Sequence, residues 1–265
     1  MITIFTPTYN RAYIINKLYN SLCNQTSKDF EWVVVDDGSN DSTESLIKEW
    51  IQQKLINIIY IKQNNGGKHR AINRGVKSAK GELFFVVDSD DYLAEDAIES
   101  IEKEWNKIKN NPKVVGLCFR KVNYITNEII GKPFPINRSL ATTLQIHYTW
   151  KINNDKAEVF KTQELKKHPF PEIENEKFFS EGYIWNKVAG NNDTLLYCIN
   201  KGIYYCEYLN DGLTKNFSKL LKRNPKGFII YYSSLLKHRI VWKHPISIIK
   251  ITIRLFQSYY YNTKK

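Results

Sequence analysis

Long apolar runs are absent from this chain of 265 residues. A helix that spans a membrane needs about 18 consecutive apolar residues, and no run approaches that length. The first residues, MITIFTPTYN, also lack the basic segment and long apolar core of a secretory signal peptide. We therefore expect a cytoplasmic protein.

Paired cysteines and the glycines of a phosphate loop are also absent. The chain has no Cys-x-x-Cys spacing, and its cysteines lie among apolar neighbours, which favours buried free thiols over disulfides or zinc ligands. No Gly-x-x-x-x-Gly-Lys-Ser/Thr motif occurs, so the sequence holds no P-loop. The cysteines are Cys23, Cys118, Cys198 and Cys206.

Acidic residues are outnumbered: 27 Asp and Glu stand against 39 Lys and Arg, and the formal charge is +12. Such an excess favours polyanionic partners, namely nucleic acid, an acidic membrane surface or a phosphate-bearing substrate. A basic surface that only aids solubility is the alternative. Hydrophobic residues at 42% and charged residues at 25% are typical of a folded globular chain.

Strand and helix patterns alternate along the first half of the chain. Short apolar runs predict buried strands at residues 2–5, 32–35, 58–61 and 83–87. Residues with helical spacing lie between them, so we predict an α/β fold with a doubly wound, mostly parallel sheet flanked by helices. The second half is less regular: residues 114–119 predict a strand, residues 183–189 a helix, and residues 131–171 loops with short elements.

Each predicted strand of the first half ends at a polar cluster. The clusters are residues 6–10, residues 36–37, residues 64–68 and residues 88–91. Because the carboxyl ends of parallel strands share one edge of the sheet, where ligands bind, we expect these clusters to form a single site.

The last of these clusters carries three carboxylates within four residues, those of Asp88, Asp90 and Asp91. Like charges so close together are unfavourable unless a cation or solvent relieves them. A hard divalent ion that also accepts diphosphate oxygens would do so, and we favour this metal site. The alternative is a solvated turn that caps the next helix, a role that Asp91 would suit.

Two further clusters suit a nucleotide. Asp36 or Asp37 can accept a hydrogen bond from a base or a ribose hydroxyl, although a turn before a capped helix would also explain them. Residues 65–68, Asn-Gly-Gly-Lys, place flexible backbone and a cation near a helix start, which suits phosphate.

Taken together, these motifs resemble those of family 2 glycosyltransferases, which have the nucleotide-binding GT-A fold. The matching segments follow the family's order: TPTYNR (6–11), VVVDDGSNDST (33–43), NGGKHRAINRG (65–75) and FFVVDSDDYL (84–93). Two later segments, FFSEGYIWNKVA (178–189) and YLNDGLT (208–214), resemble a bacterial branch that builds surface polysaccharides.

The resemblance implies a metal-dependent, inverting transfer of a sugar from a nucleoside-diphosphate donor, of the UDP type, to a hydroxyl of a glycan or lipid-linked acceptor. Asp88 and Asp90 would hold Mn²⁺ or Mg²⁺, with Asp88 also directed toward the ribose. Asp37 would contact uracil. The other residues of the donor-nucleotide site would be Thr6, Thr8, Tyr9, Asp36, Lys68, Asn73 and Ser89.

One catalytic residue departs from the family's pattern. Many relatives take the base from the aspartate of a Glu-Asp pair, and here Gly182 occupies the aspartate position. We therefore predict that Glu181 takes the acceptor's proton, with Glu176 as the neighbouring carboxylate to test against it. The alternative is that Glu181 only begins the helix at Tyr183, since helix starts favour acidic residues.

Two other function classes remain open. A sugar nucleotidyltransferase also combines an α/β domain with a carboxylate-held metal, but it typically has a glycine-rich loop after its first strand, and TPTYNR has no glycine. A non-catalytic polyanion-binding module would suit the charge. No nucleic-acid motif is present, so we do not expect nucleic acid as a partner.

We expect a GT-A domain over residues 1–215, with a nucleotide half at 1–110 and an acceptor half at 111–215, before a basic helical extension at 216–265. In the extension, apolar residues recur at helical spacing among lysines and arginines: Ile249, Ile253, Phe256 and Tyr260. Such a helix can lie on an anionic membrane, here the inner face of the plasma membrane. Its apolar side can equally pack on the protein's own core or on another subunit.

Overall fold

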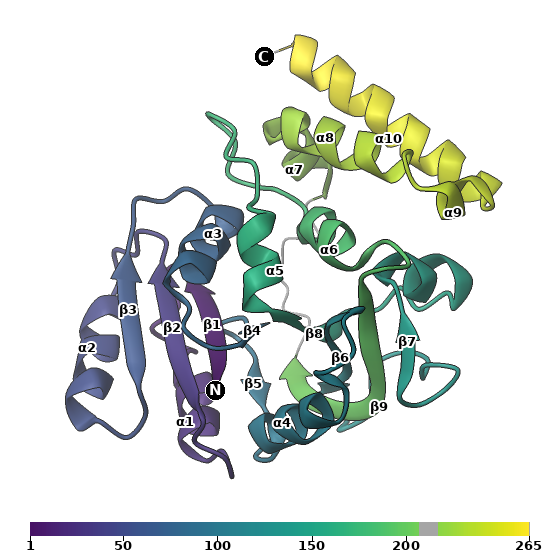
Figure 1. Cartoon of the computed structure of the whole chain (residues 1–265). Helices are drawn as coiled ribbons and strands as arrows, with labels where there is room; N and C mark the ends of the chain where they lie inside the picture. Colours follow the sequence, from purple (N-terminus) through teal and green to yellow (C-terminus); the bar gives the residue numbers. More distant parts are fainter. Residues whose placement is uncertain (207–216, 265) are drawn as a thin grey trace.

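The computed structural model of this chain describes residues 1–206 and 217–264 (Figure 1). Four parallel strands build one half of its sheet in the order β3-β2-β1-β4. They are β1 (Ile2–Thr8), β2 (Phe30–Asp36), β3 (Ile58–Lys62) and β4 (Leu83–Val86). All residues of β2 are buried, as its continuous apolar run predicted.

The other half of the sheet is mixed. The strand β8 (Lys156–Lys161) runs antiparallel to both of its neighbours, β4 and β6 (Val114–Asn123), and β9 (Leu195–Cys206) runs parallel to β6. Two short strands, β5 (Tyr92–Leu93) and β7 (Ser139–Ala141), pair with β9. The predicted α/β class is confirmed, with a mixed sheet of nine strands in the described part of the chain.

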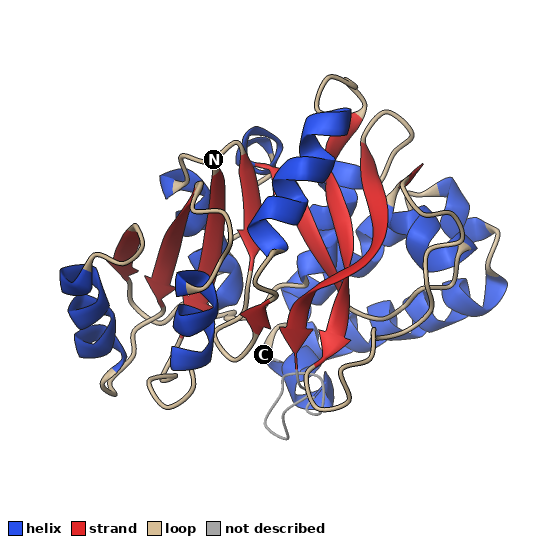
Figure 2. Ribbon diagram, turned by 90° about the horizontal axis from the view of Figure 1, so that it is seen from below, coloured by secondary structure: helices blue, strands red, loops and turns tan. Residues whose placement is uncertain are grey.

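Helices cover both faces of this sheet (Figure 2). One face carries α1 (Asn16–Cys23), α2 (Thr43–Gln53) and α4 (Ala97–Ile108), and the other carries α3 (Lys68–Ser78), α5 (Thr162–Lys167) and α6 (Glu181–Ala189). Successive side chains of β1 serve opposite cores, because a strand alternates its sides: Ile4 packs with Trp32, whereas Phe5 packs with Phe84 and Ile72.

Among residues 217–264, four helices follow the sheet: α7 (Phe217–Arg223), α8 (Pro225–Leu235), α9 (Arg239–Trp242) and α10 (Pro245–Thr263). Glu176 fixes the start of α8, where its carboxylate accepts hydrogen bonds from the backbone N–H groups of Lys226 (2.9 Å) and Gly227 (2.8 Å). The first N–H groups of a helix have no hydrogen-bond acceptor inside the helix, and here the Glu176 carboxylate is that acceptor.

A third apolar cluster attaches the last helices to the body of the protein. Leu235, Val241 and Ile251 pack with Leu144 and with Tyr148 of the π-helical turn η1 (Gln145–Thr149). The helix α10 lies outside α8 as the outermost layer (Figure 1). The predicted boundary at residue 215 and the segment 208–214 lie outside the described residues, so the division into domains stays a prediction.

Other expectations can be compared directly with the structure. The free thiols are confirmed: Cys118, Cys198 and Cys206 are buried, Cys23 is half-buried, and each is unpaired. Over residues 1–206 and 217–264, no helix combines the length and the apolar character that crossing a membrane requires.

His69 allows a test of the packing around α3. The imidazole is buried beside Phe170 and Phe179, and its Nδ1 atom has no hydrogen-bond partner among the described residues. Burial lowers its pKa from 6.5 to about 4. Below pH 6.5 the unfolded chain therefore binds a proton that the folded chain excludes, so the free energy of unfolding should fall as the pH is lowered from 6.5 to 4, by about 3 kcal/mol.

His69→Gln should remove most of this pH dependence, which urea unfolding at a series of pH values would measure. The control His168→Gln, at a half-buried histidine just after α5, should keep the slope of the parent protein. A slope that survives in His69→Gln would show that His69 is not the group responsible.

Candidate active site

One ammonium group joins two carboxylates that are far apart in the sequence. Lys68 Nζ lies 2.6 Å from Asp88 Oδ1 and 2.8 Å from Glu181 Oε1. Lys68 begins α3, Asp88 follows β4, and Glu181 begins α6. Glu181 thus does start a helix, as the alternative interpretation had it, but its carboxylate also faces Lys68 across the site.

Attraction between these charges outweighs the cost of their burial. Burial alone would lower the pKa of Lys68. The negative charges of Asp88 and Glu181 have the larger effect, so the pKa of Lys68 lies above its usual range. Burial acts to raise the pKa of Asp88, but Lys68 and Lys121 bring it below its usual value. Lys68 and Asp88 therefore both carry their charges at neutral pH.

Asp90 stands beside this group and takes part in no ion pair within the described residues. Burial raises its pKa, and the charge of Asp88 adds to the effect. A divalent cation held by both carboxylates would relieve this repulsion, so the residues fit a hard metal ion. The described chain has no group of three or more His, Cys, Asp or Glu side chains able to hold a metal, so such an ion would need further oxygen ligands from a bound molecule or water.

Two residues outside the sequence motifs complete this corner of the site. The Tyr204 hydroxyl of β9 accepts a hydrogen bond from the Asp88 N–H (3.0 Å) and donates one to Asp91 Oδ2 (2.7 Å). Lys121 Nζ, from β6, lies 3.9 Å from Asp91 Oδ2 and 3.9 Å from the centre of the Tyr204 ring. The sequence analysis missed Tyr204 and Lys121, since only the pairing of β6 with β9 brings them here.

Asp91 therefore has a structural partner. Burial raises its pKa to about 7, and it is bonded to Tyr204 beneath the site. The suggested role as cap of the next helix is wrong for this residue, because the N-cap residue of α4 is Asp96.

Asp37 organises the loop that leads into α3. Its carboxylate oxygens accept four hydrogen bonds of 2.7 to 3.3 Å, from the N–H groups of Gly66 and Gly67 and the side-chain amides of Gln63 and Asn65. Gly67 has φ +98°, and a Cβ atom there would lie 1.9 Å from the carbonyl oxygen of Lys177, so only glycine fits. The loop thereby fixes the position of Lys68, and the contact of Asp37 with uracil stays a prediction.

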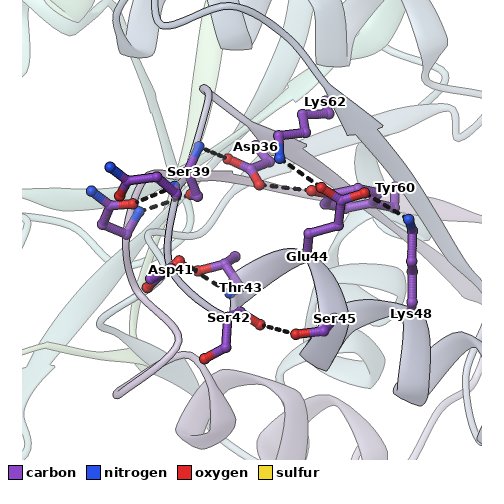
Figure 3. A network of polar contacts seen from close by, with 12 residues as sticks. Asp36, Ser39, Asp41, Ser42, Thr43, Glu44, Ser45, Lys48, Tyr60 and Lys62 are labelled. Carbon is purple, nitrogen blue, oxygen red and sulfur yellow. Dashed lines mark hydrogen bonds and ion pairs between the residues drawn. The ribbon is translucent and has the colours of Figure 1, made fainter.

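Asp36 is fully buried and serves the turn after β2 (Figure 3). Its Oδ1 accepts a hydrogen bond from the Ser39 N–H and its Oδ2 accepts one from the Tyr60 hydroxyl, both at 2.7 Å. Glu44 lies beside this pair and forms ion pairs of 2.6 Å with Lys48 and Lys62. Both oxygens of Asp36 are thus bonded to the protein itself.

The end of β1 provides groups that a ligand could use. Thr8 Oγ1 is buried without a hydrogen-bond partner among the described residues, and the Tyr9 ring is 47% exposed. Thr6 is turned to the core instead, where its hydroxyl accepts a hydrogen bond from the Trp32 indole N–H at 2.9 Å. Ser89 is buried between the two aspartates.

The side chain of Asn73 is engaged away from the Lys68 group. Its amide donates to the carbonyl oxygen of Phe170 (2.9 Å) and to Glu172 (2.8 Å), and its oxygen accepts from the Phe170 N–H (2.8 Å). It also lines a cavity of about 500 Å³ between α3, α5 and α6. The structure therefore does not bring Asn73 together with Lys68, Asp88 and Glu181.

Tyr231 of α8 packs closely against the glycine after Glu181. A Cβ atom at Gly182 would lie 3.3 Å from the Tyr231 hydroxyl oxygen and 3.7 Å from Ser180 Oγ. A side chain at this position would therefore need the Tyr231 hydroxyl to shift by a few tenths of an ångström. Glu181 is then the carboxylate that this helix start presents to Lys68.

A family model described as Glycosyl transferase family 2 matches residues 3–168, more than half of the chain. The chain belongs to this family. The matched range includes Lys68, Asp88 and Asp90 and ends before Glu181, so the candidate base lies outside the matched residues.

Two curated glycosyltransferases match less than half of the chain. It is 37% identical over 103 residues to the glycosyltransferase GlyA of Streptococcus pneumoniae, covering 39% of this chain and 15% of that protein. It is 34% identical over 119 residues to the poly(ribitol-phosphate) beta-N-acetylglucosaminyltransferase TarP of Staphylococcus aureus, covering 43% of this chain and 36% of that one. The match thus spans well under half the length of either relative.

Solved structures confirm the predicted GT-A fold. TarS 1-349 of S. aureus in complex with UDP-GlcNAc has a TM-score of 0.63 at 22% identity, covering 86% of this chain and 66% of that one. The mannosyltransferase PcManGT of Pyrobaculum calidifontis, in complex with GDP-Man and Mn²⁺, has a TM-score of 0.62 at 17% identity. This match covers 98% of this chain and 73% of that one. At these identities the likeness concerns the fold.

The role of Asp37 in holding the loop before α3 can be tested without an activity assay. Asp37→Asn replaces one acceptor oxygen by an NH₂ group that faces an N–H donor, so we expect the free energy of unfolding to fall by about 1–3 kcal/mol. The amides of Gly66 and Gly67 should also exchange hydrogen faster.

The control for this variant is Asp193→Asn, because the Asp193 side chain is 87% exposed. It should leave both the unfolding curve and the exchange rates unchanged. If Asp37→Asn behaves like this control, the loop does not depend on the Asp37 carboxylate.

Proposed function

We propose that this family 2 protein transfers a sugar from a nucleoside-diphosphate sugar, of the UDP type, to a hydroxyl of a glycan or lipid-linked acceptor, with inversion at the anomeric carbon. The observation that carries the proposal is the convergence of Asp88, Lys68 and Glu181. A direct displacement needs positive charge at the leaving group and a base at the attacking group. These residues supply both within one site.

In the proposed reaction, the acceptor oxygen bonds to the anomeric carbon while the bond from that carbon to the diphosphate oxygen breaks. The electron pair of the broken bond leaves with the nucleoside diphosphate. Glu181 takes the proton of the acceptor hydroxyl, and Lys68 donates hydrogen bonds to the diphosphate as its charge grows. A single displacement inverts the anomeric centre.

Asp88 and Asp90 would hold Mn²⁺ or Mg²⁺ in the working enzyme, and the repulsion between the Asp90 carboxylate and the nearby charge of Asp88 supports that assignment. The ion would supply further neutralisation of the diphosphate charge. Lys68 contacts both Asp88 and Glu181, so its ammonium links the side of the site that would hold the ion to the candidate base.

The nucleotide end of the donor is assigned to the edge formed by the end of β1. The exposed Tyr9 ring can stack on a base, and the unpaired Thr8 hydroxyl can bond to it or to the ribose. The motif resemblance and the likeness to the TarS complex with UDP-GlcNAc support uridine. The name of TarP gives poly(ribitol-phosphate) as its acceptor, which supports a surface polysaccharide as the acceptor of this chain as well.

The first test is nucleotide release by the full chain from a panel of sugar nucleotides with glycan acceptors. We expect release of UDP from a UDP-sugar, loss of release in EDTA, and recovery with Mn²⁺ or Mg²⁺. Asp90→Asn should lower turnover about 100-fold or more, because it removes a charged metal ligand, with an unchanged unfolding temperature. The control Asp193→Asn should keep full turnover.

Two results would refute parts of this proposal. Full turnover in the chelator would exclude the metal. Release of pyrophosphate from a nucleoside triphosphate and a sugar phosphate, with no release from any sugar nucleotide, would identify a nucleotidyltransferase instead.

Glu181 and Glu176 should respond differently to the same substitution. Glu181→Gln should lower kcat about 10²–10⁴-fold with little change in donor affinity, because the proton acceptor is lost. Glu176→Gln should instead lower the free energy of unfolding by about 1–2 kcal/mol, because Glu176 caps α8, and should keep kcat per folded molecule. The opposite pattern in steady-state kinetics and urea unfolding would show that Glu181 is not the base.

A further inference from the structure

The helix α10 presents a continuous apolar stripe to solvent. Its residues Ile246, Ile249, Ile253, Phe256 and Tyr260 recur every three or four positions, and each is 51% to 70% exposed. This spacing places them on one side of the helix. The alternative that this side packs on the protein's own core is therefore wrong for the described residues.

The opposite side of α10 is the one that the protein covers. Ile251 and Ser258 are buried, and Ile248 packs in the third apolar cluster with Leu235 of α8. Contacts with α7, α8 and α9 hold the helix in this orientation, so the stripe is a fixed feature of the outer surface (Figure 1). An exposed, contiguous apolar surface of this kind marks an interaction site.

The charge of the whole protein is concentrated in the same region. Residues 212–265 contain 12 Lys and Arg and no Asp or Glu, whereas the residues before them hold equal numbers of basic and acidic side chains. The formal charge of +12 thus belongs to the segment that ends in α10. Lys243, Lys250 and Lys264 are exposed on or beside the helix.

A basic cavity adjoins the start of α10. It has a volume of about 620 Å³ and is lined by His238, Arg239, Lys243 and His244, together with Ile240, residues 190–192 and polar and apolar residues at the turn η1. Arg239 and Lys243 are exposed at this cavity. The cations of this cavity suit an anionic headgroup.

We propose that α10 lies flat on an anionic membrane surface, with the stripe inserted at the boundary of headgroups and acyl chains and the basic residues facing anionic headgroups. An apolar stripe between cationic side chains, with tyrosines near one end, suits this environment. This inference goes beyond the proposed transferase activity and does not depend on it.

Two other occupants fit these observations less well. A second copy of the chain would bring two wholly cationic segments together, since a symmetric contact pairs the same patch on both subunits. Nucleic acid would match the charge but would leave the isoleucine and phenylalanine side chains without an apolar partner, because its phosphates bind basic groups.

The test is co-sedimentation of the full chain with vesicles of phosphatidylcholine alone or with phosphatidylglycerol added. We expect binding only to the anionic vesicles, with weaker binding at about 0.5 M salt than at about 0.1 M. The double variant Ile253→Gln with Phe256→Gln should weaken binding about tenfold or more. Lys243→Gln with Lys250→Gln should also weaken it and reduce the salt dependence.

The matched control is Leu55→Gln with Ile136→Gln, two exposed apolar residues outside α10 (63% and 68%). It should bind vesicles like the parent protein. Because both stripe positions are exposed, the stripe variant should keep the parent's unfolding temperature and its release of UDP with a soluble acceptor, which separates this test from that of the transferase.

Three outcomes would overturn the proposal. The parent chain could ignore anionic vesicles, or the stripe variant could bind them as tightly as the control. A dimer that sedimentation velocity detects in the parent and not in the stripe variant, without vesicle binding, would show that a second copy covers the stripe.

Discussion

The ammonium of Lys68 is the interaction on which the rest of the site depends. Asp88 and Glu181 come from elements on different parts of the chain, and two carboxylates brought this close would repel each other without a cation between them. Lys68 is held in turn by the loop that Asp37 closes with four hydrogen bonds. Asp37, at the end of β2, thus fixes the loop before α3, and that loop fixes the ammonium of Lys68 between the two carboxylates.

The sequence predicts much of this arrangement because strand ends obey a general rule. Apolar runs that stop at polar residues place Asp37, Lys68 and Asp88 at one edge of a parallel sheet. The sequence does not show which of these three side chains binds a ligand and which holds the protein's own backbone. Whether a carboxylate is free for a ligand depends on which N–H groups reach its oxygens, and for Asp37 those donors lie in the loop after the next strand.

The strand pairing in the second half of the sheet could not be predicted from the sequence. β8 lies within a stretch predicted as loops with short elements, and it is positioned by antiparallel pairing with β4 and β6, which no local pattern reveals. Tyr204 and Lys121 reach the site for the same reason, through the pairing of β9 with β6. Asn73 illustrates the reverse: it belongs to a family motif, yet its amide is used by Phe170 and Glu172.

The helix α8 connects the two surfaces for which functions are proposed. On one side Tyr231 packs against Gly182, next to Glu181, and on the other Leu235 packs in the cluster that holds Ile251 of α10. The first turn of α8 is fixed by Glu176. Packed interiors resist deformation, so a membrane bound to the stripe of α10 would hold the active site at a set orientation. The orientation of Glu181 toward an acceptor would then depend on the same helix that packs against Gly182.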